Sequence, residues 1–171
     1  MIKLIQSAVM GQYGAALSML AGSIERADRE TWLAPVAQFP FWHVAYHTLY
    51  YADLYLSPNE QAHRPQPFHL PDYNFLGPQS WAPDKKFVAD RPYDKNTLAA
   101  YAETCRAKAK VAIPLQSEAD LAGPSGFSWL NFTRLELHLY NIRHIQHHTG
   151  QLTAALRRRG AEGTPWVGSA P

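Results

Sequence analysis

Near its C-terminal end the chain reads Arg143-His144-Ile145-Gln146-His147-His148-Thr149-Gly150-Gln151. This stretch lies inside a proline-free segment, residues 131–159, whose apolar residues recur at helical spacing. The segment is predicted to form one long helix that is capped by Gly160 at its C-terminal end. Residues four apart in a helix lie on one face, one turn above the other, so His144 and His148 are expected to point the same way.

Three earlier segments show the same apolar spacing, at residues 1–26, 41–56 and 93–113. Together with the C-terminal helix they predict an all-α protein, a four-helix bundle that forms a single domain over residues 1–171. Gly11 and Gly14 lie inside the first helix, where they either weaken it or allow a neighbouring segment to approach closely.

A long crossover, residues 59–92, joins the second and third of these helices. Prolines recur through it and exclude a regular helix, whereas its five aromatic side chains indicate an ordered segment: Phe68, Tyr73, Phe75, Trp81 and Phe87. We interpret the crossover as a cover over one end of the bundle. Residues 161–171 are expected to form a frayed tail.

The composition excludes several classes of protein. The formal net charge is only +2, and the basic residues form no stripe of the kind that binds nucleic acid. No apolar run approaches the roughly 18 residues of a membrane helix, and the N-terminus lacks the features of a signal peptide. The single cysteine, Cys105, has no partner for an intramolecular disulfide. We therefore expect a cytoplasmic protein without nucleic-acid or membrane partners.

The histidine pair of the last helix lies on a stripe that is expected to face the interior. The stripe also carries Leu137, Asn141, Gln151 and Ala155. The opposite side of this helix is apolar as well, at Leu135, Leu139 and Ile142. A helix with two apolar sides favours a homodimer that packs through it. His138 and His147 are offset from the stripe and are expected at the surface or in that interface.

Two histidines on one helix need a third ligand from elsewhere to make a metal site. The strongest candidate is His47, which forms an i, i+4 pair with His43, so that periodicity alone does not decide between them. His47 lies deeper in its helix, beside Tyr50, Tyr51 and Leu54. The alternative is that these histidines are core residues. Each would then need polar partners, because an unpaired buried imidazole costs ~1–3 kcal/mol.

Two motifs resemble those of the DinB-like (damage-inducible) superfamily, which includes the thiol-dependent bacillithiol and mycothiol transferases. One is Trp42-x4-His47-Thr-Leu followed by Asp53, and the other is His-x3-His-x-Gly-Gln from His144 through Gln151. The expected architecture also resembles that family along nearly the whole chain, with four helices and a long crossover between the second and third.

The resemblance implies that His47, His144 and His148 bind a divalent ion such as zinc, nickel or iron, with water in the open position. Members of the family commonly carry an acid one residue after the first histidine of the fourth helix, where this chain has Ile145. This departure removes one carboxylate from the expected site and leaves an acid–base role without a residue.

The activity implied is that of a metal-dependent thiol S-transferase, in which the ion activates a small thiol, or of a hydrolase. Asp53 and Gln151 are candidates to support a ligand imidazole, and Cys105 is not expected to be the nucleophile. Four side chains are candidates to orient a small-molecule substrate: His43, Tyr46, Tyr50 and Tyr140.

Two further hypotheses remain open at this point. One is a non-catalytic, stress-linked protein that kept the fold and the metal for a binding or interaction role, because a fold does not determine a function. The other is a bundle without metal, whose histidines serve only the structure.

Overall fold

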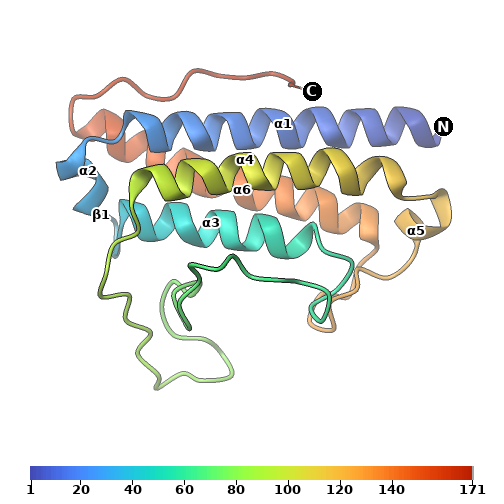
Figure 1. Cartoon of the computed structure of the whole chain (residues 1–171), viewed down its shortest axis with the longest axis horizontal. Coiled ribbons are helices and arrows are strands. Elements are labelled where there is room, and N and C mark those ends of the chain that lie inside the picture. The colour runs from blue at the N-terminus through green and yellow to red at the C-terminus, as the bar shows by residue number, and fades with distance from the viewer. Residues whose placement is uncertain (171) are drawn as a thin grey trace.

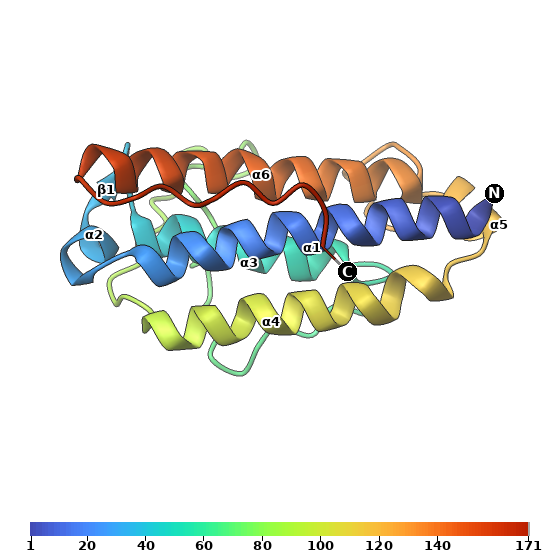
Figure 2. The same ribbon diagram turned by 90° about the horizontal axis from the view of Figure 1, so that it is seen from above.

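Four long helices lie side by side in the computed structural model, which describes residues 1–170 (Figure 1). They are α1 (Ile2–Arg26), α3 (Phe41–Tyr55), α4 (Lys95–Ala112) and α6 (Arg134–Arg158). α1 packs against α4 and α6, and α3 packs against the same two helices (Figure 2). The chain is therefore mostly α-helical, and each long helix matches one of the four predicted from the sequence.

Capping side chains determine where α4 and α6 begin, which is two to three residues later than predicted. The carboxylate of Asp94 accepts from the backbone N–H of Asn96 at 2.8 Å, and Thr133 Oγ1 accepts from Glu136 N–H at 3.2 Å. These oxygens pair N–H groups that the first turn of a helix leaves without partners, which fixes the helix start at the residue after the cap.

Short elements connect the long helices. They are α2 (Arg29–Leu33), the strands β1 (Pro35–Val36) and β2 (Phe39–Pro40), the 3-10 helix η1 (Ile113–Leu115) and α5 (Glu118–Ala122). The two strands pair antiparallel in the register Pro35–Pro40 and Val36–Phe39. This hairpin, which the sequence did not lead us to expect, leads directly into α3.

The innermost line of α6 differs from the predicted stripe. Its buried residues include Leu137, Asn141, Ile145, Thr149, Leu152 and Ala155. His144 and His148 lie half-buried beside this line, and Gln151, expected inside, is exposed. On the side predicted to be outer, Leu135 and Ile142 pack against the core of the chain, and only Leu139 is exposed. The homodimer stays a prediction.

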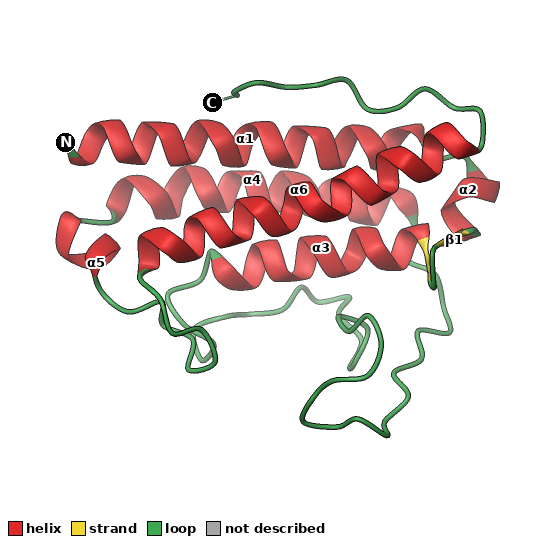
Figure 3. Ribbon diagram, turned by 180° about the vertical axis from the view of Figure 1, so that it is seen from behind, coloured by secondary structure: helices red, strands yellow, loops and turns green. Residues whose placement is uncertain are grey.

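The crossover packs beneath α3 (Figure 3). Tyr73 and Phe87 are buried, and the Tyr73 carbonyl lies 2.8 Å from His43 Nε2. The Tyr93 hydroxyl donates to the Phe68 carbonyl and accepts from the Leu70 N–H, each at 3.1 Å. Aromatic side chains therefore hold the crossover in place, which agrees with the ordered segment that the sequence predicted.

The tail differs from the frayed segment that we expected, because residues 161–170 lie along α1; residue 171 falls outside the described residues (Figure 2). Thr164 Oγ1 lies 2.6 Å from Ser23 Oγ, and the Ala170 N–H donates to the Gly11 carbonyl at 3.1 Å. A Cβ atom on Gly14 would overlap the Ala170 carbonyl oxygen. The glycines of α1 thus allow a close approach, one of the two roles predicted for them.

Within residues 1–170, no helix has both the length and the apolar character that crossing a membrane requires.

Candidate metal centre

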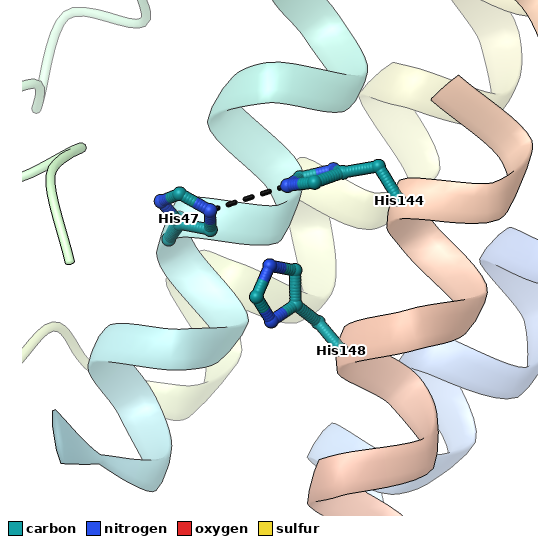
Figure 4. Close-up of side chains that lie close together, drawn as sticks. All are labelled: His47, His144 and His148. Carbon is teal, nitrogen blue, oxygen red and sulfur yellow. Dashed lines mark hydrogen bonds between the residues drawn. The ribbon is translucent and has the colours of Figure 1, made fainter. Parts of the chain in front are cut away.

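Three histidine side chains converge between α3 and α6 (Figure 4). His47 comes from α3, and His144 and His148 lie one turn apart on α6. One ring nitrogen from each lies within 4.8 Å of the others, and Nε2 of His47 is 3.2 Å from Nε2 of His144. The structure therefore brings together the three residues that the sequence singled out.

Hydrogen bonds on the far side of two rings fix their tautomers. His47 Nδ1 lies 2.7 Å from the Asn74 carbonyl, which can only accept, so Nδ1 carries the proton. His148 Nδ1 lies 2.8 Å from Gln151 Oε1, which likewise accepts. Both rings are left with an unprotonated Nε2 that can bind a metal, and a supporting hydrogen bond of this kind is typical of metal-binding histidines.

His144 lacks such a support. Its Nδ1 atom is buried and has no hydrogen-bond partner among the described residues. The following residue, Ile145, is fully buried in the hydrophobic core. Where the DinB-like pattern has an acid, this chain therefore has a side chain that contributes to packing and offers no carboxylate to the site.

Burial keeps the three imidazoles neutral. Loss of solvent, reinforced by the neighbouring His148, lowers the pKa of His47 from 6.5 to about 3. The same cause, with His47 and His148 as neighbours, lowers the pKa of His144 to about 2. The pKa of His148 is also lowered by burial. Metal ions bind neutral imidazole, so the three rings hold the protonation state that a ligand needs at neutral pH.

The geometry fits a divalent ion. Two nitrogens that bind one ion tetrahedrally at about 2.1 Å lie about 3.4 Å apart, close to the 3.2 Å between His47 Nε2 and His144 Nε2. Three imidazoles leave one position of a tetrahedral site free for water or a ligand. The three histidines thus lie close enough together to hold one metal ion.

A cavity of about 640 Å³ opens beside the histidines. His47 and His144 form part of its wall, and Tyr50 and Tyr140, both expected near a substrate, line it as well. The other lining residues are Tyr51, Leu54, Tyr55, Glu60, Asn74, Phe75, Gln79, Ser80, Trp81 and Trp129. The crossover supplies residues of this wall, so it borders the site along the side of α3 and does not cover one end of the bundle as expected (Figure 3).

Two other substrate-orienting candidates from the sequence do not line this cavity. Tyr46 is buried, and its hydroxyl is hydrogen-bonded to His69 Nδ1. His43 is buried against the Tyr73 carbonyl and the ring of Trp42. Both side chains hold the crossover against α3.

Asp53, a candidate to support a ligand imidazole, has a different role. Its carboxylate accepts from Tyr101 at 2.9 Å and forms an ion pair with Lys108, which also donates to the Asp53 carbonyl at 2.7 Å. Asp53 therefore joins α3 to α4, on a different side of α3 from His47. Of the two candidates for a supporting hydrogen bond, Gln151 makes one and Asp53 does not. Cys105, which was not expected to act as a nucleophile, is fully buried near Asp53 and Lys108.

The prediction that His138 lies at the surface or in an interface was wrong. His138 is fully buried, with Nδ1 at 3.2 Å from the Tyr13 hydroxyl and Nε2 at 2.9 Å from Gln116 Oε1. It lies one residue from Leu137 and three from Asn141, both buried, a spacing that indicates the inner face. His147, by contrast, is exposed as expected.

Comparison with known proteins adds no assignment: no family model matches the chain, and no curated protein matches its sequence.

Proposed function

We propose that the chain is a DinB-like four-helix bundle that binds one divalent ion through His47, His144 and His148 and uses it to activate a small thiol. The observation that carries this proposal is the convergence of three neutral imidazoles beside a cavity, with a 3.2 Å separation between two of the ligand atoms. Zinc, nickel and iron all suit imidazole ligands, so the donor set alone does not choose among them.

A divalent ion held by three neutral ligands keeps its full charge, and it therefore lowers the pKa of a bound thiol or water. The protein's own residues orient the metal ligands and shape the space for a substrate. The Asn74 carbonyl and Gln151 orient two of the imidazoles, and Tyr50 and Tyr140 line the space that a substrate would occupy. If a thiol were bound at this site, it would lose its proton to solvent, and its sulfur would form a bond to an electrophile in the cavity while the leaving group departs with the electron pair of the broken bond, which is the chemistry of an S-transferase. Hydrolysis would use water in the same place.

A non-catalytic metal-binding role is the second candidate, because the site offers little for proton transfer. Glu60 is the only acid among the residues that line the cavity, and its side chain is exposed. Asp53, the buried acid of α3, is already paired with Lys108. A general acid or base must lie within hydrogen-bond reach of the reacting group, and no carboxylate of the described residues is hydrogen-bonded to the three histidines.

Cobalt(II) substitution separates the two candidates. Protein reconstituted with cobalt is titrated with a small thiol such as cysteine methyl ester, and the absorption spectrum is recorded. A thiolate-to-cobalt charge-transfer band in the near ultraviolet, absent in the His148→Ala variant, is expected if thiols reach the ion. Cobalt binding without such a band for any small thiol would contradict thiol activation and favour the non-catalytic role.

A further inference from the structure

The cavity beside the histidines has an unusual wall. Half of the residues that line it are aromatic: Tyr50, Tyr51, Tyr55, Phe75, Trp81, Trp129 and Tyr140. The proposed thiol chemistry does not require so many rings. Their arrangement and the charges around them indicate what kind of ligand the cavity accepts.

One wall is a row of tyrosines that starts at the histidines. The ring of Tyr51 lies 4.8 Å from that of His47 and 5.7 Å from that of His144, measured between centroids. Tyr55 follows at 5.6 Å from Tyr51, and Tyr140 at 5.6 Å from Tyr55. The row therefore leads from the candidate metal site along α3 and across to α6.

The crossover and the link before α6 provide the other rings. Phe75 and Trp81 pack edge to face at a centroid distance of 5.7 Å. Trp129 packs on Phe127, whose ring in turn contacts Tyr55. Trp81 and Trp129 line the cavity and are 66% and 49% exposed, so part of each ring is accessible to a ligand.

The charges select among ligands. Glu60 is the only acid of the lining, and neither lysine nor arginine belongs to it. In the part of the wall away from the histidines, a phosphate or carboxylate would find neither lysine nor arginine, and a neutral apolar ligand would make no use of Glu60. A cation is attracted both by the carboxylate and by the faces of aromatic rings, with an energy that grows as the cation loses water. The chain already shows one such contact at the edge of this region, where the Arg143 guanidinium lies 5.4 Å from the Tyr140 ring centroid.

We infer that this cavity binds a small organic ligand through a cationic, ammonium-type group, with the other end of the ligand directed toward the three histidines. The part that concerns the histidine end rests on the proposed function. The cationic end does not, because the aromatic wall and Glu60 are present whether or not a metal is bound. For a thiol-dependent reaction, the inference predicts an aminothiol or an amine-bearing electrophile as the substrate.

Choline and 3,3-dimethylbutan-1-ol test this inference, because they share a shape and differ in charge. Both are titrated into chelator-treated protein, so that the absence of a metal site would not affect the result. Binding is followed by tryptophan fluorescence, to which Trp81 and Trp129 contribute, and by calorimetry. Choline is expected to bind about tenfold more tightly than its neutral isostere. Equal or weaker binding of choline, or no binding of either compound, would overturn the inference.

Matched variants test whether the preference for choline arises in this cavity. Glu60→Gln should reduce the preference for choline about threefold or more, and Trp129→Leu should weaken choline binding, whereas Glu162→Gln and Trp166→Leu should change neither. Both controls are exposed residues of the tail, outside the cavity. Trp81→Leu repeats the test from the other wall if Trp129→Leu disturbs the packing on Phe127. A preference for choline that survives Glu60→Gln and both tryptophan variants would place the cation elsewhere and contradict the inference.

Discussion

Nε2 of His47 and Nε2 of His144 lie 3.2 Å apart, although 97 residues separate them along the chain. The packing of α3 against α6 sets this distance, and hydrogen bonds from the far sides of the rings orient His47 and His148. Burial is the main cause that lowers the pKa values of both imidazoles, and neighbouring histidines add to it: His148 for His47, and His47 together with His148 for His144. The arrangement of the two rings is therefore better suited to binding a metal ion than to binding a proton.

Gln151 should support metal binding through His148. Replacing Gln151 by Leu removes the acceptor for His148 Nδ1, and metal affinity should fall about tenfold or more. Gln151→Glu keeps an acceptor in place and should retain the affinity. Competition with a chromophoric chelator measures the metal affinities of both variants. Because Gln151 is exposed, unchanged unfolding curves are expected for both variants. Equal metal affinity of the Leu and Glu variants would show that the contact has no such role.

Asp53 should matter for stability and not for metal binding. Its side chain is 3% exposed, and Asp53→Ala removes the carboxylate that accepts from the Tyr101 hydroxyl and pairs with Lys108, whose remaining contacts are with uncharged groups. The free energy of unfolding should fall by about 3 kcal/mol, as when one partner of a buried ion pair is removed. Denaturant unfolding measures this, with Asp84→Ala as the exposed control. A loss of metal affinity in folded Asp53→Ala protein would instead assign Asp53 to the site.

Two glycines should respond in opposite ways to alanine. A Cβ atom on Gly150 would meet no heavy atom within 4 Å apart from its chain neighbours and the backbone of its own helix, so Gly150→Ala in α6 should raise the free energy of unfolding by roughly 1 kcal/mol. Gly14→Ala should lose that gain and more, because its Cβ would overlap the Ala170 carbonyl oxygen. Hydrogen exchange should also show that Gly14→Ala releases the tail from α1. Equal stabilisation by both substitutions would contradict the observed path of the tail.

Acid should destabilise the protein partly through His138. Burial lowers the pKa of His138 from 6.5 to about 4, so the unfolded chain binds a proton first as the pH falls. The contribution of neutral His138 to the free energy of unfolding is complete above pH 6.5, the pKa of the unfolded chain. It is lost as the pH falls from 6.5 to about 4. In chelator-treated protein, His138→Gln should reduce the loss of unfolding free energy across this window by about 2 kcal/mol. An unchanged pH dependence would mean that His138 is not buried as a neutral group.

The sequence predicted the long helices because their apolar periodicity and their boundary residues are local features. It also predicted that His144 and His148 point the same way, since their i, i+4 spacing fixes a common direction on any helix. The choice of His47 over His43, by contrast, followed from the resemblance to the DinB-like family. It did not predict the partner of Asp53, because Lys108 and Tyr101 come from α4, about 50 residues away. Which helices face each other is a property of the assembled fold.

The two errors in α6 and the tail have different physical causes. His138 was placed outside because the stripe was centred on His144 and His148, whereas the innermost line passes through Ile145 and the histidines lie beside it. The tail was expected to fray because the last residues of a domain are usually poorly ordered unless they are tied down. It is held instead by backbone and hydroxyl hydrogen bonds to α1, which a pattern of side chains does not reveal.

Metal content decides whether the three histidines form a metal centre. Protein without an affinity tag, never exposed to a nickel column, is analysed for metals beside His47→Ala, His144→Ala and His148→Ala, with His147→Ala as the exposed control on the same helix. We predict about one divalent ion per chain in the parent and in His147→Ala, and its loss from the other three variants while they stay folded. A parent protein that holds no ion even after reloading, or one that keeps its ion in all three variants, would contradict a metal centre at these histidines.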